Sequence, residues 1–241
     1  MADNLFGDYI RQRREDAWLT RTELAKKANL SVSLIEKIEL GTRPPTLHSL
    51  QILFDHLDVA PMYRRHILAV SLPDLFGTDP RRSASAPGPD DLADLETLTG
   101  PASLYALPTF TILAANAAHR RTFPGLPPGI SFVEWMFRHP AAREVMVEWR
   151  TAARNLVHSL RMLSPNPATD PGTAELVRKC QNAPEWDELW HSRPPTGESL
   201  RHIAIRDMTT HHVQTMGVRI YAPEYPSRAW WLCRLTRGCA D

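Results

Sequence analysis

The sequence predicts an all-α N-terminal bundle followed by an α+β domain that consists of an antiparallel sheet with helices. Its 241 residues exceed the usual size of a single domain. Apolar residues recur at helical spacing over residues 5–70, whereas the pattern changes to strand-like alternation after residue 200. The segment GTDPRRSASAPGP, at 77–89, is rich in Pro, Gly, Ser and Ala and has no apolar period. We therefore expect domains at 1–76 and 90–241, joined by a linker at 77–89.

The stretch TRTELAKKANLSVSLIEKIELG, at residues 20–41, predicts two short helices joined by a tight turn. Thr20 can cap the first helix, and Glu23 three residues later completes a capping box. Asn29 suits the left-handed position that ends such a helix, and Ser31 can cap the next one. Three further helices are expected around this pair, one before it and two after it, so five helices form a closed bundle.

The second helix of the pair hides Ile35 and Ile38 and turns small and polar side chains outward. A short helix of this kind fits the major groove of DNA. The net charge of the whole chain is only +1, which argues against a generally basic nucleic-acid-binding surface. A local basic patch is nevertheless present among the first 43 residues, comprising Arg11, Arg13, Arg14, Arg21, Lys26, Lys27, Lys37 and Arg43.

The segments LTRTELA, LSVSLIEKIELG and RPP resemble the helix-turn-helix of the Cro/repressor (XRE) superfamily. The resemblance implies sequence-specific binding to double-stranded DNA. The expected DNA-binding residues are Val32, Ser33, Glu36 and Lys37 on the outer face, with Arg21 and Arg43 against the DNA backbone. It also implies a partly buried ion pair between Arg14 and Glu39. The alternative is a helical hairpin that binds no nucleic acid.

Operator recognition favours a homodimer, because one helix-turn-helix domain covers a single half-site. We therefore expect two copies of the chain on a palindromic operator.

The second domain mixes strands and helices. We expect one antiparallel sheet with helices on one face. Its longest helix is predicted at 141–163, another begins at Asp170-Pro171, and a third is capped by Asn182 with Glu185. The strands are predicted at 104–107, 111–114, 203–208, 213–221 and 229–235.

Four segments of this half resemble the MmyB-like ligand-binding domain of actinobacterial-type regulators. They are PASLYALPTFTILAANAAHR, FRHPAAREVMVEWRTAARNLVHSLRM, TDPGTAELVRKC and PEWDELW. The resemblance implies a PAS-like fold that senses small apolar molecules such as fatty acids. The chain departs from the family pattern after Trp190, where HHVQTMGVRIYAPEYPSRAWWL follows.

Aromatic residues concentrate in this domain, where they can serve the core or line an apolar pocket. The residues that we expect to contact a ligand are Phe110, Trp135, Phe137, Trp149, Trp190 and Arg143. The alternative is a protein–protein interaction module without a small-molecule ligand, with Trp186, Trp190, Trp230 and Trp231 exposed at its interface.

The motifs of enzymes and of metal or cofactor sites are missing from the sequence. It has no nucleophile elbow, no phosphate-binding glycine loop and no zinc signature, so we expect neither catalysis nor a cofactor. Three cysteines without metal-ligand spacing are typical of reduced thiols. Because no apolar run is long enough to span a membrane and the N-terminus lacks an export signal, a cytoplasmic location is expected.

Overall fold

The computed structural model of the chain describes residues 5–71, 86–164, 170–192, 201–223, 228 and 230–237. By its internal contacts the chain divides into two compact units. The first comprises residues 1–79 with 161–171, and the second comprises 80–160 with 172–241. Most of the predicted linker at 77–89 lies outside the described residues, so its boundaries stay a prediction.

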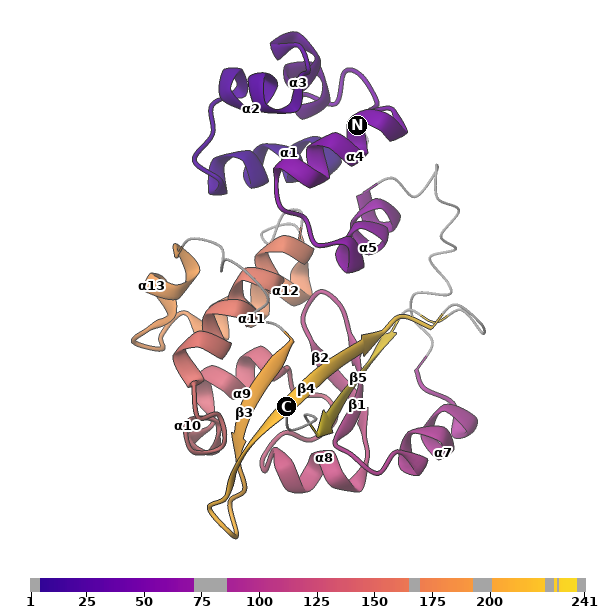
Figure 1. Cartoon of the computed structure of the whole chain (residues 1–241), viewed down its shortest axis with the longest axis vertical. Helices are drawn as coiled ribbons and strands as arrows, with labels where there is room; N and C mark the ends of the chain where they lie inside the picture. Colours follow the sequence, from indigo (N-terminus) through magenta and orange to yellow (C-terminus); the bar gives the residue numbers. More distant parts are fainter. Residues whose placement is uncertain are drawn as a thin grey trace. The chain divides into compact units, whose positions relative to one another are not determined.

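The N-terminal unit contains the five predicted helices (Figure 1). They are α1 (Leu5–Asp16), α2 (Arg21–Ala28), α3 (Val32–Glu39), α4 (Leu47–His56) and α5 (Pro61–Ser71). The helix ends follow the predicted capping. Thr20 and Glu23 form a complete capping box, Asn29 adopts a left-handed conformation with φ 51°, and the Ser31 hydroxyl accepts from the Leu34 N–H.

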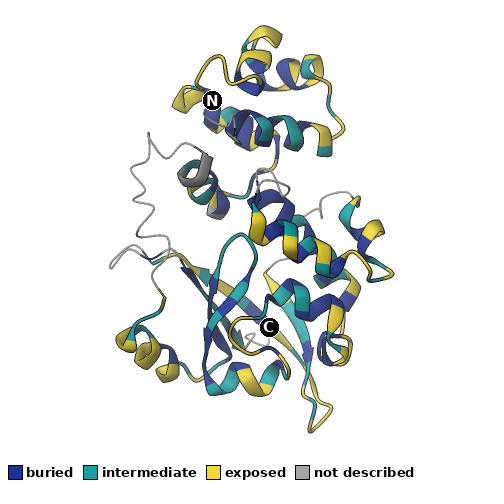
Figure 2. Ribbon diagram, turned by 180° about the vertical axis from the view of Figure 1, so that it is seen from behind, coloured by how far each residue is buried: buried dark blue, intermediate teal, exposed yellow. Residues whose placement is uncertain are grey.

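The core of this bundle is formed by the apolar side of each helix. Tyr9 and Ile10 of α1, Leu24 of α2, Ile35 of α3 and Leu53 of α4 are completely buried. Figure 2 shows the same division along the helices, with buried residues on one side and exposed ones on the other. Packing of these five helices against one another fixes the side of α3 that remains exposed.

The C-terminal unit contains a five-stranded antiparallel sheet and seven further helices among the described residues (Figure 1). The strands are β1 (Ala102–Ala106), β2 (Thr111–Ala115), β3 (His202–Arg206), β4 (Val213–Tyr221) and β5 (Trp230–Arg237). The helices are α7 (Pro89–Thr97), α8 (Ala117–Thr122), α9 (Phe132–Arg138), α10 (Pro140–Val145), α11 (Trp149–Leu163), α12 (Pro171–Cys180) and α13 (Trp186–Trp190). The division by contacts assigns the end of α11, from Arg161, and the first residue of α12 to the first unit. The predicted combination of an all-α bundle and an α+β domain is confirmed.

The sheet is held together by its last strand. The strand order is β2-β1-β5-β4-β3, so β5 lies between two hairpins that are about 100 residues apart in the sequence. Leu232 of β5 lies opposite Leu104 of β1 on one side and opposite Tyr221 of β4 on the other. The C-terminal strand is therefore needed to join the two halves of the sheet.

Helix α7 packs on one face of the sheet. Leu95 of α7 packs with Ala102, Leu104 and Trp230, which share one face. Trp231 points to the opposite face because neighbouring strand residues alternate, and it is buried as well. That the helices share one face of the sheet stays a prediction.

The long helix predicted at 141–163 is in fact two helices, α10 and α11. Between them Met146 forms an isolated antiparallel bridge with Ile205, and the Val147 N–H donates to the Ala204 carbonyl at 3.1 Å. The backbone here supplies hydrogen bonds to the edge of β3 instead of to the next helical turn. A continuous apolar period cannot reveal this break, because its cause is a strand about 60 residues away.

The predicted cap at Asn182 is also displaced, because α13 begins later, at Trp186. Glu185 occupies the cap position but forms no capping hydrogen bond with its side chain. That carboxylate instead pairs with Arg143. The predicted start of α12 at Pro171 is confirmed, as are the three C-terminal strands.

Two glycines with positive φ test how closely the C-terminal unit is packed. Gly125 has φ 78° and Gly129 has φ 91°. A Cβ at 125 would overlap the imidazole of His139, whereas a Cβ at 129 meets nothing within 4 Å. We expect Gly129→Ala to cost about 1 kcal/mol of unfolding free energy from backbone strain alone. Gly125→Ala should cost about 1–3 kcal/mol more, because His139 must move.

Urea unfolding of both variants of the full chain, followed by tryptophan fluorescence, measures the difference. Equal losses for Gly125→Ala and Gly129→Ala would contradict the close packing against His139.

Candidate functional site

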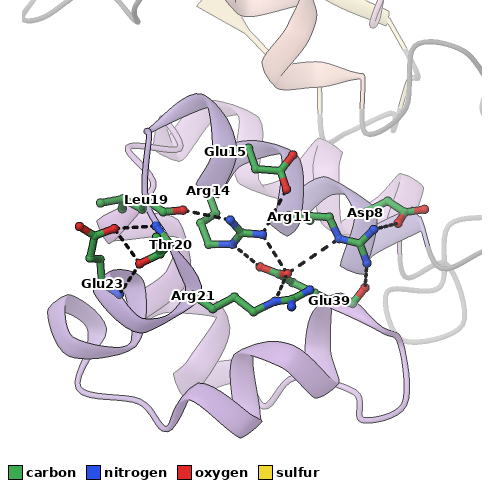
Figure 3. Close-up of polar contacts among 9 residues, drawn as sticks. All are labelled: Asp8, Arg11, Arg14, Glu15, Leu19, Thr20, Arg21, Glu23 and Glu39. Carbon is green, nitrogen blue, oxygen red and sulfur yellow. Dashed lines mark hydrogen bonds and ion pairs between the residues drawn. The ribbon is translucent and has the colours of Figure 1, made fainter.

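The buried carboxylate of Glu39 lies at the centre of the helix-turn-helix (Figure 3). Its side chain has no exposed surface. Arg14 Nε lies 2.6 Å from Oε1, and Arg14 Nη2 lies 3.1 Å from Oε2. Arg21 Nε adds a third contact, 2.8 Å from Oε2. The predicted ion pair of Arg14 with Glu39 is therefore present and is joined by an arginine of α2.

These contacts keep Glu39 ionised despite its burial. Burial alone would raise the pKa of Glu39, but hydrogen bonds from Arg14 and Arg21 outweigh it, so the pKa lies below its ordinary value. Arg14 also donates from Nη1 to the Leu19 carbonyl at 2.9 Å. The cluster thus connects the end of α3 to the end of α1, to the turn before α2 and to the first residue of α2.

The outward side of α3 carries the predicted base-reading residues. Val32, Ser33, Glu36 and Lys37 are all exposed, whereas Ile35 and Ile38 of the same helix are buried. Nearby, Arg43 is exposed in the turn after α3, and its N–H donates to the Lys37 carbonyl at 3.3 Å. The arrangement presents one short helix whose exposed side chains can meet base edges.

Arg21 has two roles available to it. Its Nε is engaged by Glu39, but its side chain is 36% exposed. The guanidinium can therefore support α3 from inside and still offer donors to a phosphate. The sequence predicted only the contact of Arg21 with the DNA backbone.

In the C-terminal unit, the predicted ligand-binding aromatics lie partly together. The Phe137 ring meets the Trp149 ring edge-on at 5.6 Å between centroids and the Trp186 ring at 4.8 Å. Trp190 stacks on Trp186 at 5.3 Å. We call Phe137, Trp149, Trp186 and Trp190 the aromatic cluster; it joins α9, α11 and α13.

Arg143 lies on the outer side of this cluster. Its guanidinium carbon is 3.9 Å from the centre of the Trp149 ring, a cation–π contact, and its Nη2 is 2.9 Å from Glu185 Oε2. Arg143, Trp149 and Glu185 line a shallow, open cleft of about 520 Å³ on the surface of the unit. The cleft is lined by Arg143, Val147, Glu148, Trp149, Arg150, Thr151 and Glu185.

The other two predicted aromatics lie elsewhere. Trp135 is almost completely buried against Phe123, and its indole N–H donates to the Pro124 carbonyl at 2.9 Å. Phe110 stacks on Tyr105 at 5.7 Å in the β1–β2 hairpin. Neither residue has a ring contact with the aromatic cluster among the contacts described, and neither lines the cleft.

Sequence reasoning missed most of the cleft. Glu185 reaches Arg143 across 42 residues, and Arg150 pairs with Glu188 across 38. Val147 and Glu148 enter the cleft because the chain leaves the helix between α10 and α11. A pattern of spacing within one helix cannot identify such residues.

The tryptophans expected at an exposed protein interface are mostly buried. Trp186, Trp230 and Trp231 are each less than 10% exposed, and only Trp190 is half-buried. The feature that favoured a protein-interaction module is therefore absent from the structure at three of its four positions.

Within the described ranges, no group of three or more His, Cys, Asp or Glu side chains could hold a metal ion. No described helix is long and apolar enough to cross a membrane. Burial raises the pKa of the Cys180 thiol to about 12, so this cysteine stays protonated at neutral pH.

Comparison with protein families accounts for both units. The family model described as MmyB-like transcription regulator ligand binding domain matches residues 95–231, more than half of the chain. A second model, described as helix-turn-helix domain, matches residues 5–67. No curated protein matches the chain. Both resemblances drawn from the sequence are confirmed by these matches.

The Glu39 cluster predicts a specific effect on stability. At neutral pH, Glu39→Gln should lower the unfolding free energy by about 3–5 kcal/mol, because it leaves buried Arg14 without its charged partner. Because the folded-state pKa of Glu39 is depressed, its contribution is present above its ordinary pKa of 4.5 and is lost as the pH falls through the folded value. The difference between wild type and variant should therefore shrink in acid.

Denaturant titrations between neutral and acidic pH measure this difference, with Glu15→Gln as the control. Glu15 also pairs with Arg14, but its side chain is 60% exposed, so this change should cost less than about 1 kcal/mol. Equal effects of the two substitutions would show that burial of Glu39 is not what makes its ion pairs stabilising.

Proposed function

Because the chain belongs to the family of the MmyB-like transcription regulator ligand binding domain and carries a helix-turn-helix, we propose that it binds an operator as a homodimer and senses a small ligand. The two domains make it a DNA-binding transcription regulator. The finer parts of the proposal are the residues that read DNA, the dimer, the ligand and a cytoplasmic location.

The exposed side of α3 is the observation that carries the DNA-binding part. In this proposal Val32, Ser33, Glu36 and Lys37 meet base edges in the major groove. Arg43 and the free donors of Arg21 meet phosphates on either side. These roles are supported by exposure, because each of these side chains is at least partly accessible. Ile35 and Ile38 of α3 are buried in the core instead.

We propose a dimer because the DNA-binding helix α3 is short. A single helix such as α3 spans a few base pairs, and regulators of this kind gain affinity by placing two copies one helical turn apart. An inverted-repeat operator is the matching DNA.

For the ligand, the cleft beside the aromatic cluster is the best-supported site. We infer that a small molecule places a carboxylate against Arg143 and an apolar body against Trp149 and Val147, which line the cleft. Arg143 is suited to this because Trp149 holds its guanidinium in place and its present partner, Glu185, can be exchanged for an external carboxylate. A fatty acid has both required parts.

A ligand can alter DNA binding only if it binds the DNA-competent and DNA-incompetent states with different affinities. Exchange of Glu185 for a ligand carboxylate would free the residue that precedes α13. A local rearrangement of α13 against α11 is thus the first step that the proposal requires.

The first test separates base reading from phosphate contact. Lys37→Ala should weaken operator binding by about 1–3 kcal/mol and relax sequence preference at one or two base pairs. Arg43→Ala should weaken binding to all sequences alike and reduce the salt dependence, because one phosphate contact is lost. Quantitative binding to a library of operator variants at several salt concentrations distinguishes the two. If Lys37→Ala left sequence preference intact, the proposed docking of α3 would be excluded.

The second test addresses the ligand and its carboxylate. Decanoic acid should raise the melting temperature of the full chain more than its methyl ester, because only the acid can pair with Arg143. Arg143→Gln should remove this advantage of the acid. Arg178→Gln is the matched control and should keep it, because this exposed arginine of α12 pairs with its helical neighbour Glu175 and lies outside the cleft. An equal response to acid and ester in the wild type would rule out Arg143 as the carboxylate partner.

A further inference from the structure

Along β4, which lies beside the central strand β5, the side chains of one face are largely exposed. The outward residues Val213, Thr215, Arg219 and Tyr221 are all exposed, while Met216 on the inward side is buried. Figure 1 shows no helix drawn across β4 on the side that faces the viewer. A strand inside an antiparallel sheet usually has either two buried faces or one buried and one polar face. On β4, by contrast, the apolar side chains of Val213 and Tyr221 are 43% and 49% exposed.

Two arginines lie side by side on this face, and no described residue forms an ion pair with either of them. Arg219 of β4 is directly opposite Arg234 of β5. Like charges at opposed positions of antiparallel strands destabilise a sheet. Arg234 Nε is buried and has no hydrogen-bond partner, and no ion pair to either arginine is present within the described part of the chain. Among the described residues, the Arg219 guanidinium donates to its neighbour's carbonyl, Val218 O, at 3.1 Å.

The same face of the sheet carries an acidic helix, α7. Its Leu95 packs with Trp230, which lies on the same side of β5 as Arg234 because the two are four residues apart in one strand. Asp91 and Glu96 of α7 pair with arginines of their own chain. Asp90 and Asp94 are exposed, and neither has an ion pair among the described residues.

We propose that this face is the homodimer interface, with α7 of each copy lying on the β4–β5 arginines of the other. The exposed carboxylates Asp90 and Asp94 would meet Arg219 and Arg234, and exposed Leu92 would cover Tyr221 or Val213. The face is self-complementary, as the two-fold axis of a dimer requires: it contains both the acidic and the basic element. This inference rests on the proposed function, which requires two copies on one operator, and it adds where they meet.

A second copy fits better than an unrelated acidic partner because the chain itself supplies the complementary surface. The unpaired charges occur in both signs on one face, and an exposed leucine, 43% accessible, accompanies the acidic ones. Burial of apolar area then adds to charge pairing at the same interface.

Sedimentation of the full chain over a range of concentrations tests the proposal with charge reversals. Arg219→Glu and Asp94→Arg should each raise the dimer dissociation constant by about tenfold or more, because each juxtaposes like charges. The double variant that combines Arg219→Glu with Asp94→Arg should regain much of the dimer affinity, because the acidic and basic partners are then exchanged across the interface. Arg178→Glu, on α12, is the matched control and should dimerise as the wild type does.

Thermal unfolding and binding to a DNA duplex with a single half-site accompany each variant. Unchanged melting and half-site binding in Arg219→Glu show that a loss of dimer reflects the interface and not the fold. A wild type that stays monomeric, a dimer indifferent to Arg219→Glu, or a double variant weaker than both single ones would each overturn the interface. Absence of half-site binding in the wild type would instead count against the proposed DNA-binding function.

Discussion

Burial of the Glu39 carboxylate is the constraint on which the arrangement of the helix-turn-helix depends. A charge without exposed surface is tolerated only because Arg14 and Arg21 donate to it from α1 and α2. Those bonds fix the three helices together at the end of α3, and so they determine which residues of α3 face outward. The interaction that stabilises the fold therefore also keeps Val32, Ser33 and Lys37 on the exposed side of α3.

In the C-terminal unit the comparable constraint is the position of β5. The β1–β2 and β3–β4 hairpins can pair into one sheet only through a strand that comes last in the chain. The helices α8 to α13 lie between those hairpins in the sequence, which places the cleft-lining segment around Met146 against the edge of β3. The cleft and the sheet are thus formed together.

Local signals in the sequence predicted what local physics decides. The capping box at Thr20, the left-handed Asn29 and the strand alternation of 213–221 each depend on neighbouring residues, and each is present. Predictions failed where distant segments decide. The helix break at Met146 comes from β3, and the Glu185 carboxylate is taken by Arg143. For the same reason, aromatic content indicated a binding domain but could not separate cluster residues from core.

Selection of DNA sequences from a random library by the full-length protein tests the central claim most directly. We expect enrichment of an inverted repeat whose half-site centres lie about one helical turn, roughly 10 base pairs, or a multiple of it apart. It also predicts that replacing Val32, Ser33 and Lys37 together by alanine abolishes this enrichment while the protein remains folded. A library that emerges without any enriched sequence, or with the same repeat from the triple variant, would contradict it.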